Sequence, residues 1–200
     1  MKMNWVEKML MNNPIRAAFQ IWYEVPLLER LGGRTEGMKV LEVGCGRGVG
    51  TEQILNRFGA SSVLAMDLDP DMVRLARKRL MKYPADRLSL TVGDVTAIQA
   101  EDQSFDAVFD FAIIHHVPIW QDALKEIHRV LKPGGRFFFQ EVTSHALEKW
   151  SYQTFMVHPV ENRFSGTEFI NELERLGIQV GTKTTEKYGG DFVYGVGIKK

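Results

Sequence analysis

The residues best suited to chemistry are grouped between Glu42 and Gly50, in the segment Glu-Val-Gly-Cys-Gly-Arg-Gly-Val-Gly. Glycines at every second position let the backbone approach a bound molecule without an intervening Cβ atom. A phosphate-binding P-loop would need Gly-Lys-Ser/Thr at its end, but the sequence there is Gly50-Thr51-Glu52. A dinucleotide fingerprint would need glycine where Val49 or Thr51 stands. The pattern therefore favours a nucleoside ligand without a pyrophosphate.

Two carboxylates further along the chain supply contacts that a nucleoside needs. Asp67 ends a second apolar segment and can accept hydrogen bonds from both ribose hydroxyls, as an acidic residue does in dinucleotide sites. Asp69 is better placed to cap the helix that follows, which leaves Asp67 for the ligand. Asp94 lies in Gly93-Asp94-Val95 after the next apolar segment, where a carboxylate and a backbone amide can meet an adenine edge.

Candidate proton acceptors lie further along the chain. His115 and His116 follow the fourth expected strand, and either can contact a ligand, with one of them acting as a general base. Alternatively, one histidine fixes the loop and its neighbour lines a wall. Glu141 lies near the end of the fifth expected strand. There it can bind a substrate that carries a cationic or hydroxyl group, cap backbone groups or form a salt bridge. His145 and His158 are further candidates.

These residues are expected to be positioned by an α/β fold, because short β-branched or apolar segments alternate with helical patterns. Seven strands are predicted, at residues 39–43, 62–66, 88–92, 105–112, 136–142, 178–185 and 192–198. Helical patterns lie between them, near residues 50–58, 69–82, 121–131 and 165–176. The alternation predicts parallel strands joined by right-handed crossovers, with helices on both faces. No helix separates the last two strands, so we expect a doubly wound, Rossmann-like, seven-stranded mixed sheet with one antiparallel strand.

Residues 1–36 precede this sheet and are predicted to form an N-terminal helical cap. Their apolar side chains are expected to pack on the core or beneath the cap, and four of them have helical spacing: Ile15, Ala18, Phe19 and Trp22. Trp5, Met9, Met11 and Tyr23 are further apolar residues of this segment with the same expected packing. A further hypothesis is an apolar acceptor pocket beneath the cap, or membrane contact with a lipid-like substrate.

Composition excludes several classes of protein. The 200 residues include 25 basic and 25 acidic ones, and this balance argues against a nucleic-acid partner, which normally requires a basic excess. Cys45 is the single cysteine, so the chain forms no intramolecular disulfide and no cysteine-rich metal site. We predict no metal centre, because the adjacent histidines lack the i, i+4 spacing of a helical ligand pair. Without a signal peptide or an apolar run of ~18 residues, a cytoplasmic protein is expected.

Five motifs in order resemble the class I S-adenosylmethionine-dependent methyltransferases, and most closely the branch of small-molecule and quinone methyltransferases. The motifs are Val40-Leu41-Glu42-Val43-Gly44-Cys45-Gly46-Arg47-Gly48, Met66-Asp67-Leu68-Asp69-Pro70-Asp71-Met72, Gly93-Asp94-Val95, Phe105-Asp106-Ala107-Val108 and Leu131-Lys132-Pro133-Gly134-Gly135-Arg136. The segment His115-His116-Val117-Pro118 is also similar to one found often in this family.

The resemblance implies a class I methyltransferase domain over residues 37–200 that binds S-adenosyl-L-methionine. By this likeness, the methionine part lies against the glycine loop, the ribose against Asp67 and the adenine against Asp94 and Val95. The complete predicted cofactor site is Glu42, Gly44, Cys45, Gly46, Gly48, Asp67, Leu68, Asp94 and Val95. The predicted catalytic residues are His115, His116 and Glu141.

The implied reaction is in-line transfer of a methyl group to a small-molecule acceptor, of apolar or lipid-like character. The alternative is a non-catalytic S-adenosylmethionine-binding module, or an inactive subunit of a methyltransferase complex, because cofactor motifs report binding rather than turnover. Adenine-type nucleic-acid methyltransferases carry Asn/Asp-Pro-Pro-aromatic where this chain has Asp110-Phe111-Ala112-Ile113-Ile114, which argues against that activity.

Overall fold

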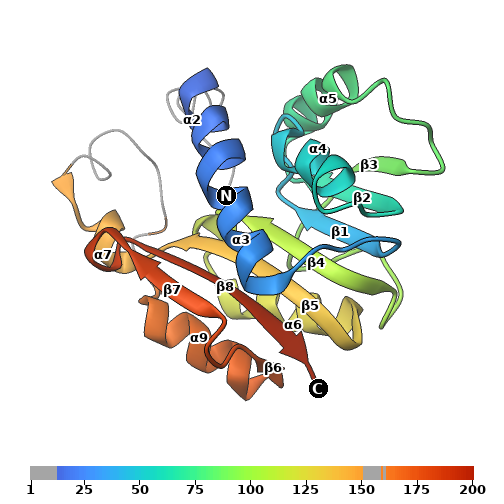
Figure 1. The fold of residues 1–200 in the computed structure, drawn as a ribbon. Helices are drawn as coiled ribbons and strands as arrows, with labels where there is room; N and C mark the ends of the chain where they lie inside the picture. The colour runs from blue at the N-terminus through green and yellow to red at the C-terminus, as the bar shows by residue number, and fades with distance from the viewer. Residues whose placement is uncertain (1–12, 151–158, 160) are drawn as a thin grey trace.

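The computed structural model describes residues 13–150, 159 and 161–200. Within them, eight strands form one sheet in the order β3-β2-β1-β4-β5-β8-β6, and β7 also pairs with β8 (Figure 1). The first five strands are parallel, whereas β8 runs antiparallel to β5, β6 and β7. The strands are β1 (Lys39–Val43), β2 (Ser62–Asp67), β3 (Leu88–Val92), β4 (Phe105–Phe111), β5 (Leu131–Val142), β6 (Ile178–Gln179), β7 (Thr184–Lys187) and β8 (Phe192–Lys199). The predicted mixed sheet with one reversed strand is confirmed.

The count of seven strands needs one correction, because the predicted strand at 178–185 is divided into β6 and β7. Between them, Gly181 has a positive φ of 55°, which takes the backbone out of the extended conformation. The amides of Val180 and Gly181 donate to Oε1 of Glu174 at 2.8 and 3.3 Å instead of to a strand. Both short strands pair with β8, so they share one edge position of the sheet.

Helices cover both faces of the sheet, as predicted (Figure 1). The cluster that includes Leu124 of α6 and Phe169 of α9 packs on one face, and the cluster that includes Leu28 of α3 and Ile54 of α4 packs on the other. The helical segments are α2 (Pro14–Phe19), η1 (Gln20–Glu24), α3 (Val25–Gly32), α4 (Val49–Asn56), α5 (Pro70–Arg79), η2 (Ile114–His116), α6 (Trp120–Val130), α7 (Ser144–Leu147), α9 (Gly166–Arg175) and η3 (Tyr188–Gly190). No helix in the described ranges is long and apolar enough to cross a bilayer.

Two helix starts follow the local signals in the sequence. The Asp69 side chain accepts a hydrogen bond from the Asp71 amide at 3.0 Å and caps α5, whose first residue is Pro70. Ser165 and Glu168 form a capping box at the start of α9. The carboxylate of Asp69 is thus used as a cap, which leaves Asp67, at the end of β2, available to a ligand.

The segments α2 and η1 expose several of their apolar side chains, contrary to the predicted packing, whereas α3 buries Val25, Leu27 and Leu28. Ile15, Phe19 and Trp22 are 77, 39 and 79% exposed, and Ala18 is also exposed. The buried face instead carries Glu24, which is 1% exposed. Helical spacing identifies an apolar stripe, but the direction of the stripe depends on what the helix packs against, and here the inner side is polar. Trp5, Met9 and Met11 lie outside the described residues.

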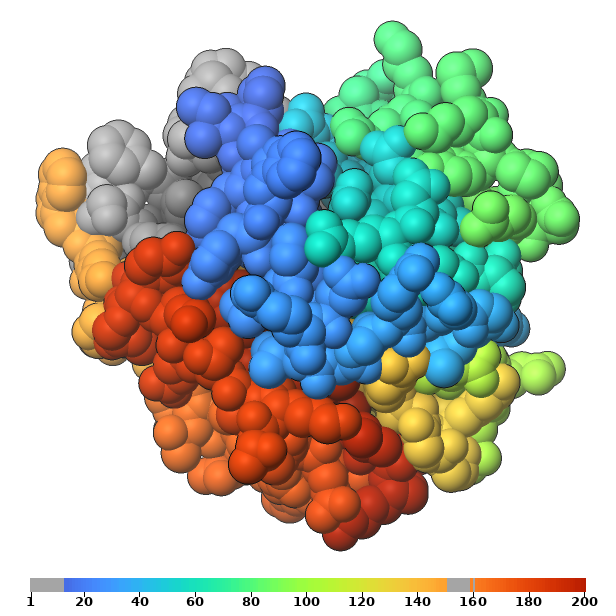
Figure 2. Space-filling view, in the orientation of Figure 1, coloured from blue at the N-terminus to red at the C-terminus, as the bar shows by residue number. Residues whose placement is uncertain are grey.

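A π-helical turn joins α2 to α3. Pro26 lacks a backbone N–H and its ring disturbs the preceding turn, so the regular i→i−4 ladder cannot continue through this point. The Val25 amide donates instead to the carbonyl of Gln20, five residues back. Tyr23 within this turn stacks on Phe19 at 5.0 Å between ring centroids, as the predicted packing of Tyr23 requires. Figure 2 shows the N-terminal helices on the viewed face, between the C-terminal strands and the helices α4 and α5.

Candidate active site

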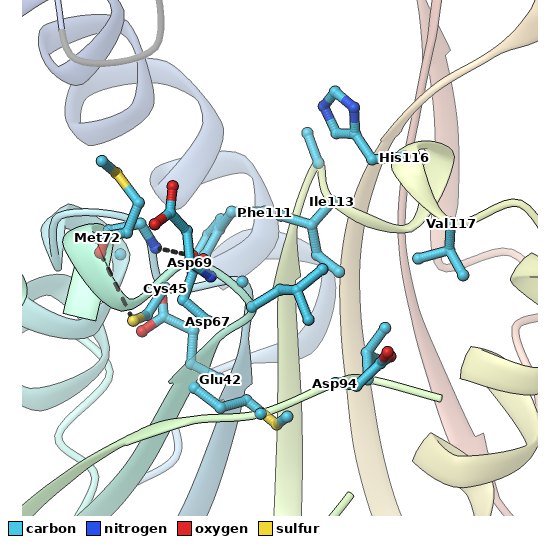
Figure 3. Close-up of a pocket in the computed structure, with 18 of the residues that line it drawn as sticks. Glu42, Cys45, Asp67, Asp69, Met72, Asp94, Phe111, Ile113, His116 and Val117 are labelled. Atoms are coloured by element: carbon cyan, nitrogen blue, oxygen red, sulfur yellow. Dashed lines mark hydrogen bonds between the residues drawn. The ribbon is translucent and has the colours of Figure 1, made fainter. Parts of the chain in front are cut away.

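A cavity of about 410 Å³ lies at the carboxyl ends of β1, β2 and β4 (Figure 3). The sheet order places β2 on one side of β1 and β4 on the other, so this is a point where the strand order reverses and open α/β sheets bind ligands. Eight of the nine predicted cofactor residues line the cavity: Glu42, Gly44, Cys45, Gly46, Asp67, Leu68, Asp94 and Val95.

Gly48, the ninth residue, is not among the lining residues and has a structural role instead. It is the N-cap of α4 with a φ of 85°, and a Cβ atom there would lie 2.7 Å from Cδ1 of Leu80. Gly46 differs, because a Cβ atom there would meet nothing within 4 Å although φ is 52°. Gly48 is therefore required by packing, whereas Gly46 lies beside open space in the cavity.

Glu42 is fully buried in the cavity wall, where its carboxylate accepts a hydrogen bond from Oγ1 of Thr51. Gly50 leaves room for this side chain, since a Cβ atom there would collide with Oε1 of Glu42. Burial raises the pKa of Glu42 to about 8, and the negative charge of Asp67 acts in the same direction. A cationic group in the cavity would stabilise the ionised form of Glu42, so this carboxyl group is suited to an ammonium ligand.

Asp67 is held by backbone amides on both of its oxygens. The amide of Gly46 donates to Oδ2 and the amide of Asp69 donates to Oδ1, each at 2.8 Å. Each carboxylate oxygen accepts more than one hydrogen bond, so a diol can still be bound. Asp94 forms a turn in which Oδ1 accepts from the amide and hydroxyl of Thr96 at 2.9 and 2.8 Å. Both acids are thus fixed in position at the cavity.

The predicted catalytic residues separate into one that lines the cavity and two behind it. His116 is a lining residue and lies across the cavity from Asp67 (Figure 3). His115 is buried, with its ring centroid 4.2 Å from that of His116 and Nδ1 2.6 Å from Oε2 of Glu141. Glu141 is 0% exposed and does not line the cavity. His145 does not line the cavity; its Nδ1 forms a hydrogen bond of 2.8 Å with Oδ1 of Asp191. His158 lies outside the described residues.

Glu141 organises the turn that carries the histidines. Its carboxylate accepts hydrogen bonds from the amides of Ile114, His115 and Val142 at 2.6, 3.3 and 3.2 Å, in addition to the imidazole contact. Burial alone would raise the pKa of Glu141, but the neighbouring His115 imidazole and the hydrogen bonds outweigh it and lower this pKa. The carboxylate is therefore occupied by the turn η2, which is the capping alternative among its predicted roles.

Asp110 is a buried acid that the sequence analysis did not assign to the site. It is 0% exposed near the end of β4, and its Oδ1 accepts from the amide of Ile113 at 3.0 Å. Burial and the neighbouring charge of Glu141 raise the pKa of Asp110 well above its usual range. The pKa is thus raised for Asp110 and lowered for Glu141. The signal in the sequence was an acidic residue placed between Phe109 and Phe111, in the apolar second half of the strand.

Residues 40–135 match the family model described as "Methyltransferase domain". The whole chain also superposes on a solved SAM-dependent methyltransferase from Aquifex aeolicus with a TM-score of 0.75 and 24% identity, covering 98% of each chain. The matched part of the chain, residues 40–135, is therefore a methyltransferase domain. The family predicted from the five motifs, and the class of cofactor that accompanies it, are therefore confirmed.

Sequence relatives of the methyltransferase domain include enzymes with different acceptors. It is 34% identical over 110 residues to phosphoethanolamine N-methyltransferase 2 of Caenorhabditis elegans, a match that covers 55% of this chain and 25% of the relative. It is 38% identical over 103 residues to sterol 24-C-methyltransferase of Debaryomyces hansenii, covering 51% of this chain and 27% of the relative. The matches thus span about a quarter of each of these relatives.

Proposed function

We propose that the domain binds S-adenosylmethionine in this cavity and transfers its methyl group to a small-molecule acceptor. The observation that carries the proposal is the succession of Glu42, Asp67 and Asp94 along the ends of β1, β2 and β3. In that order, the three carboxyl groups suit the ammonium, the ribose hydroxyls and the adenine edge of one extended ligand. The match of the domain to a methyltransferase family supports the same ligand.

The chemistry of this transfer depends mainly on alignment. The acceptor's lone pair forms a bond to the methyl carbon while the carbon–sulfur bond breaks, and the bonding electrons remain on sulfur. Well-oriented reactants gain about 7–11 kcal/mol from proximity, whereas a general base contributes about 3–5 kcal/mol. The main contribution of this chain is therefore a cavity that fixes the nucleoside and aims the methyl group.

His116 is the residue we assign to contact with the acceptor or its leaving proton, because it lines the cavity whereas His115 and Glu141 lie behind it. Glu141 and His115 are positioning residues in this proposal. They hold the turn η2 from beneath through the hydrogen bonds of Glu141 to backbone amides. An imidazole is suited to accept a proton near neutral pH when the acceptor is a hydroxyl or an ammonium group.

We assign an apolar or lipid-like character to the acceptor. The cavity wall includes Met72, Ile113, Val117 and Ile119. The outer face of the N-terminal helices exposes Ile15 and other large apolar side chains beside the same cavity. Such a surface suits contact with an aggregated lipid, and co-sedimentation with phosphatidylcholine vesicles tests this part of the proposal. Vesicles that leave all of the protein in the supernatant would remove the membrane contact.

Calorimetric titration with S-adenosylmethionine, S-adenosylhomocysteine and NAD tests the cofactor. Asp67→Ala should weaken binding of both adenosyl ligands by about 1–3 kcal/mol, as expected for the loss of charge-assisted hydrogen bonds. Asp86→Ala, which alters an exposed acid, is the matched control and should bind like the wild type. Equal affinity of the Asp67 variant and the wild type would refute the ribose assignment.

The second candidate function is a module that binds S-adenosylmethionine without turnover. A screen of amines, phenols, quinones, sterols and fatty acids for release of S-adenosylhomocysteine separates the two. Release with any acceptor, lost in Asp67→Ala, supports the enzyme. Tight cofactor binding without release across the screen supports the module.

A further inference from the structure

The N-terminal helices present a polar stripe to the interior, which is the reverse of an ordinary surface helix. Arg16, Gln20 and Glu24 follow one another at intervals of four residues and therefore share one face. Arg16 and Gln20 line the cavity, and Glu24 is buried behind them. Polar groups on the inner face of a helix need a polar partner, so this stripe points to a ligand with polar groups on the same side.

Arg16 is held in place by a chain of two hydrogen bonds that ends on the sheet. Its Nη1 donates to Oε2 of Glu24 at 2.7 Å, and Nε2 of Gln140 in β5 donates to Oε1 of the same carboxylate, also at 2.7 Å. Glu24 and Gln140 are each 1% exposed, whereas the side chain of Arg16 is 23% exposed. Two fully buried residues thus fix a guanidinium group at the cavity wall.

In the part of the chain that the structure describes, the guanidinium edge formed by Nε and Nη2 has no hydrogen-bond partner. Among the described residues, Glu24 is the single hydrogen-bond partner of the Arg16 side chain, and it contacts only Nη1. The remaining edge, formed by Nε and Nη2, has the spacing that binds both oxygens of a carboxylate. Burial raises the pKa of Glu24, and the ion pair and hydrogen bond with Arg16 act in the opposite direction. An anion in the cavity would complete the pairing.

We propose that Arg16, positioned by Glu24 and Gln140, is a carboxylate-binding residue of the cavity. This inference rests on the proposed function. The carboxylate comes either from the methionine part of the cofactor or from an acidic acceptor, and both present the same chemistry to the guanidinium edge. The family match begins at residue 40, so Arg16 and Glu24 lie outside it.

Calorimetry of the full chain with two adenosyl probes separates the sources. S-adenosylhomocysteine carries a carboxylate, whereas 5′-methylthioadenosine has the same nucleoside without the amino acid. For Arg16→Gln we expect an affinity for S-adenosylhomocysteine reduced about 10- to 100-fold, with unchanged affinity for methylthioadenosine. Unchanged binding of both probes, with a raised KM for carboxylate-bearing acceptors only, assigns the residue to the acceptor instead.

Two further variants complete the test. Arg16→Lys keeps the charge but loses the planar edge, and should recover only part of the affinity. Arg74→Gln removes an arginine whose side chain is 72% exposed, and should match the wild type. The inference is overturned if Arg16→Gln matches the wild type with both probes and in acceptor KM. If the wild type binds neither probe, the proposed function fails instead. If Arg16→Gln still binds methylthioadenosine, its fold is intact.

Discussion

The ionisation of Glu42 should make the free protein less stable as the pH rises. An unfolded carboxyl group loses its proton near the ordinary pKa of 4.5, whereas the folded protein retains the proton up to a pKa of about 8. Between these values the folded state binds more protons than the unfolded state, so the stability that this proton contributes is lost as the pH rises towards 8. At 1.36 kcal/mol per pKa unit, the loss between pH 6 and pH 8 is about 2 kcal/mol.

Glu42→Gln isolates this effect, because the amide keeps the size of the side chain and its oxygen can still accept from Thr51. We compare the free energy of unfolding of the variant with that of the wild type, measured in urea without cofactor. This difference should favour the variant by about 2 kcal/mol more at pH 8 than at pH 6. This comparison cancels the contributions of all other titrating groups. Parallel loss of stability in both proteins over this range would refute the reasoning.

The same variant should bind the cofactor more weakly, because an amide does not attract an ammonium group as a carboxylate does. In the wild type, affinity for S-adenosylhomocysteine should increase with pH between 6 and 8, since the ionised form of Glu42 is the binding form. The variant should lack this pH dependence in calorimetric titrations. A gain in free-protein stability together with a loss of binding is the combination that identifies Glu42 as a ligand-binding group.

Three further substitutions, with one control variant, test how the site is built. Gly48→Ala should destabilise the fold by about 1–3 kcal/mol with little effect on cofactor affinity, because φ is 85° and the new methyl group would contact Leu80. Gly46→Ala also strains a positive φ, of 52°, but its methyl group would enter open space in the cavity, so this variant should in addition lower cofactor affinity. Thermal melts and calorimetry on both variants check this division, and equal effects on binding would contradict it. Glu141→Gln should destabilise the protein by about 3 kcal/mol and lower kcat more than cofactor affinity, because His115 loses its buried anionic partner and the turn carrying His116 loosens. His116→Ala is the control, which should lower kcat with a smaller loss of stability, and a Glu141 variant with normal kcat would remove the positioning role.

Much of the cofactor site could be predicted from the sequence because its residues follow strands directly. Parallel strands bring their carboxyl ends to one edge of the sheet, so locating Asp67 and Asp94 after apolar segments was enough to place them together. The exclusion of a dinucleotide site likewise depended only on residues within the loop, Val49 and Thr51. Gly48 shows the limit of this approach, because its role depends on a contact with Leu80 in a different element.

The residues that sequence reasoning missed depend on contacts between distant segments. Arg16 reaches the sheet through Glu24 and Gln140, and the last two are separated by 116 positions. The apolar spacing of Ile15 and Trp22 indicated a helix, but an amphipathic pattern does not say whether the inner surface is apolar. Here the face that Arg16, Gln20 and Glu24 turn inward is polar, and the apolar side chains of Ile15 and Trp22 are exposed.

The buried acids of the site explain why its chemistry could be located but not described from the sequence. Burial raises the pKa of Glu24, Glu42 and Asp110, whereas the His115 imidazole and hydrogen bonds lower the pKa of Glu141. Position in the chain determines where these carboxyl groups lie, but their charge is set by burial and by partners that only the fold supplies. A raised pKa means that the fold alone does not stabilise the ionised form of that carboxyl group. A cationic ligand beside Glu42 would stabilise that charge, so binding and ionisation are coupled at the bottom of this cavity.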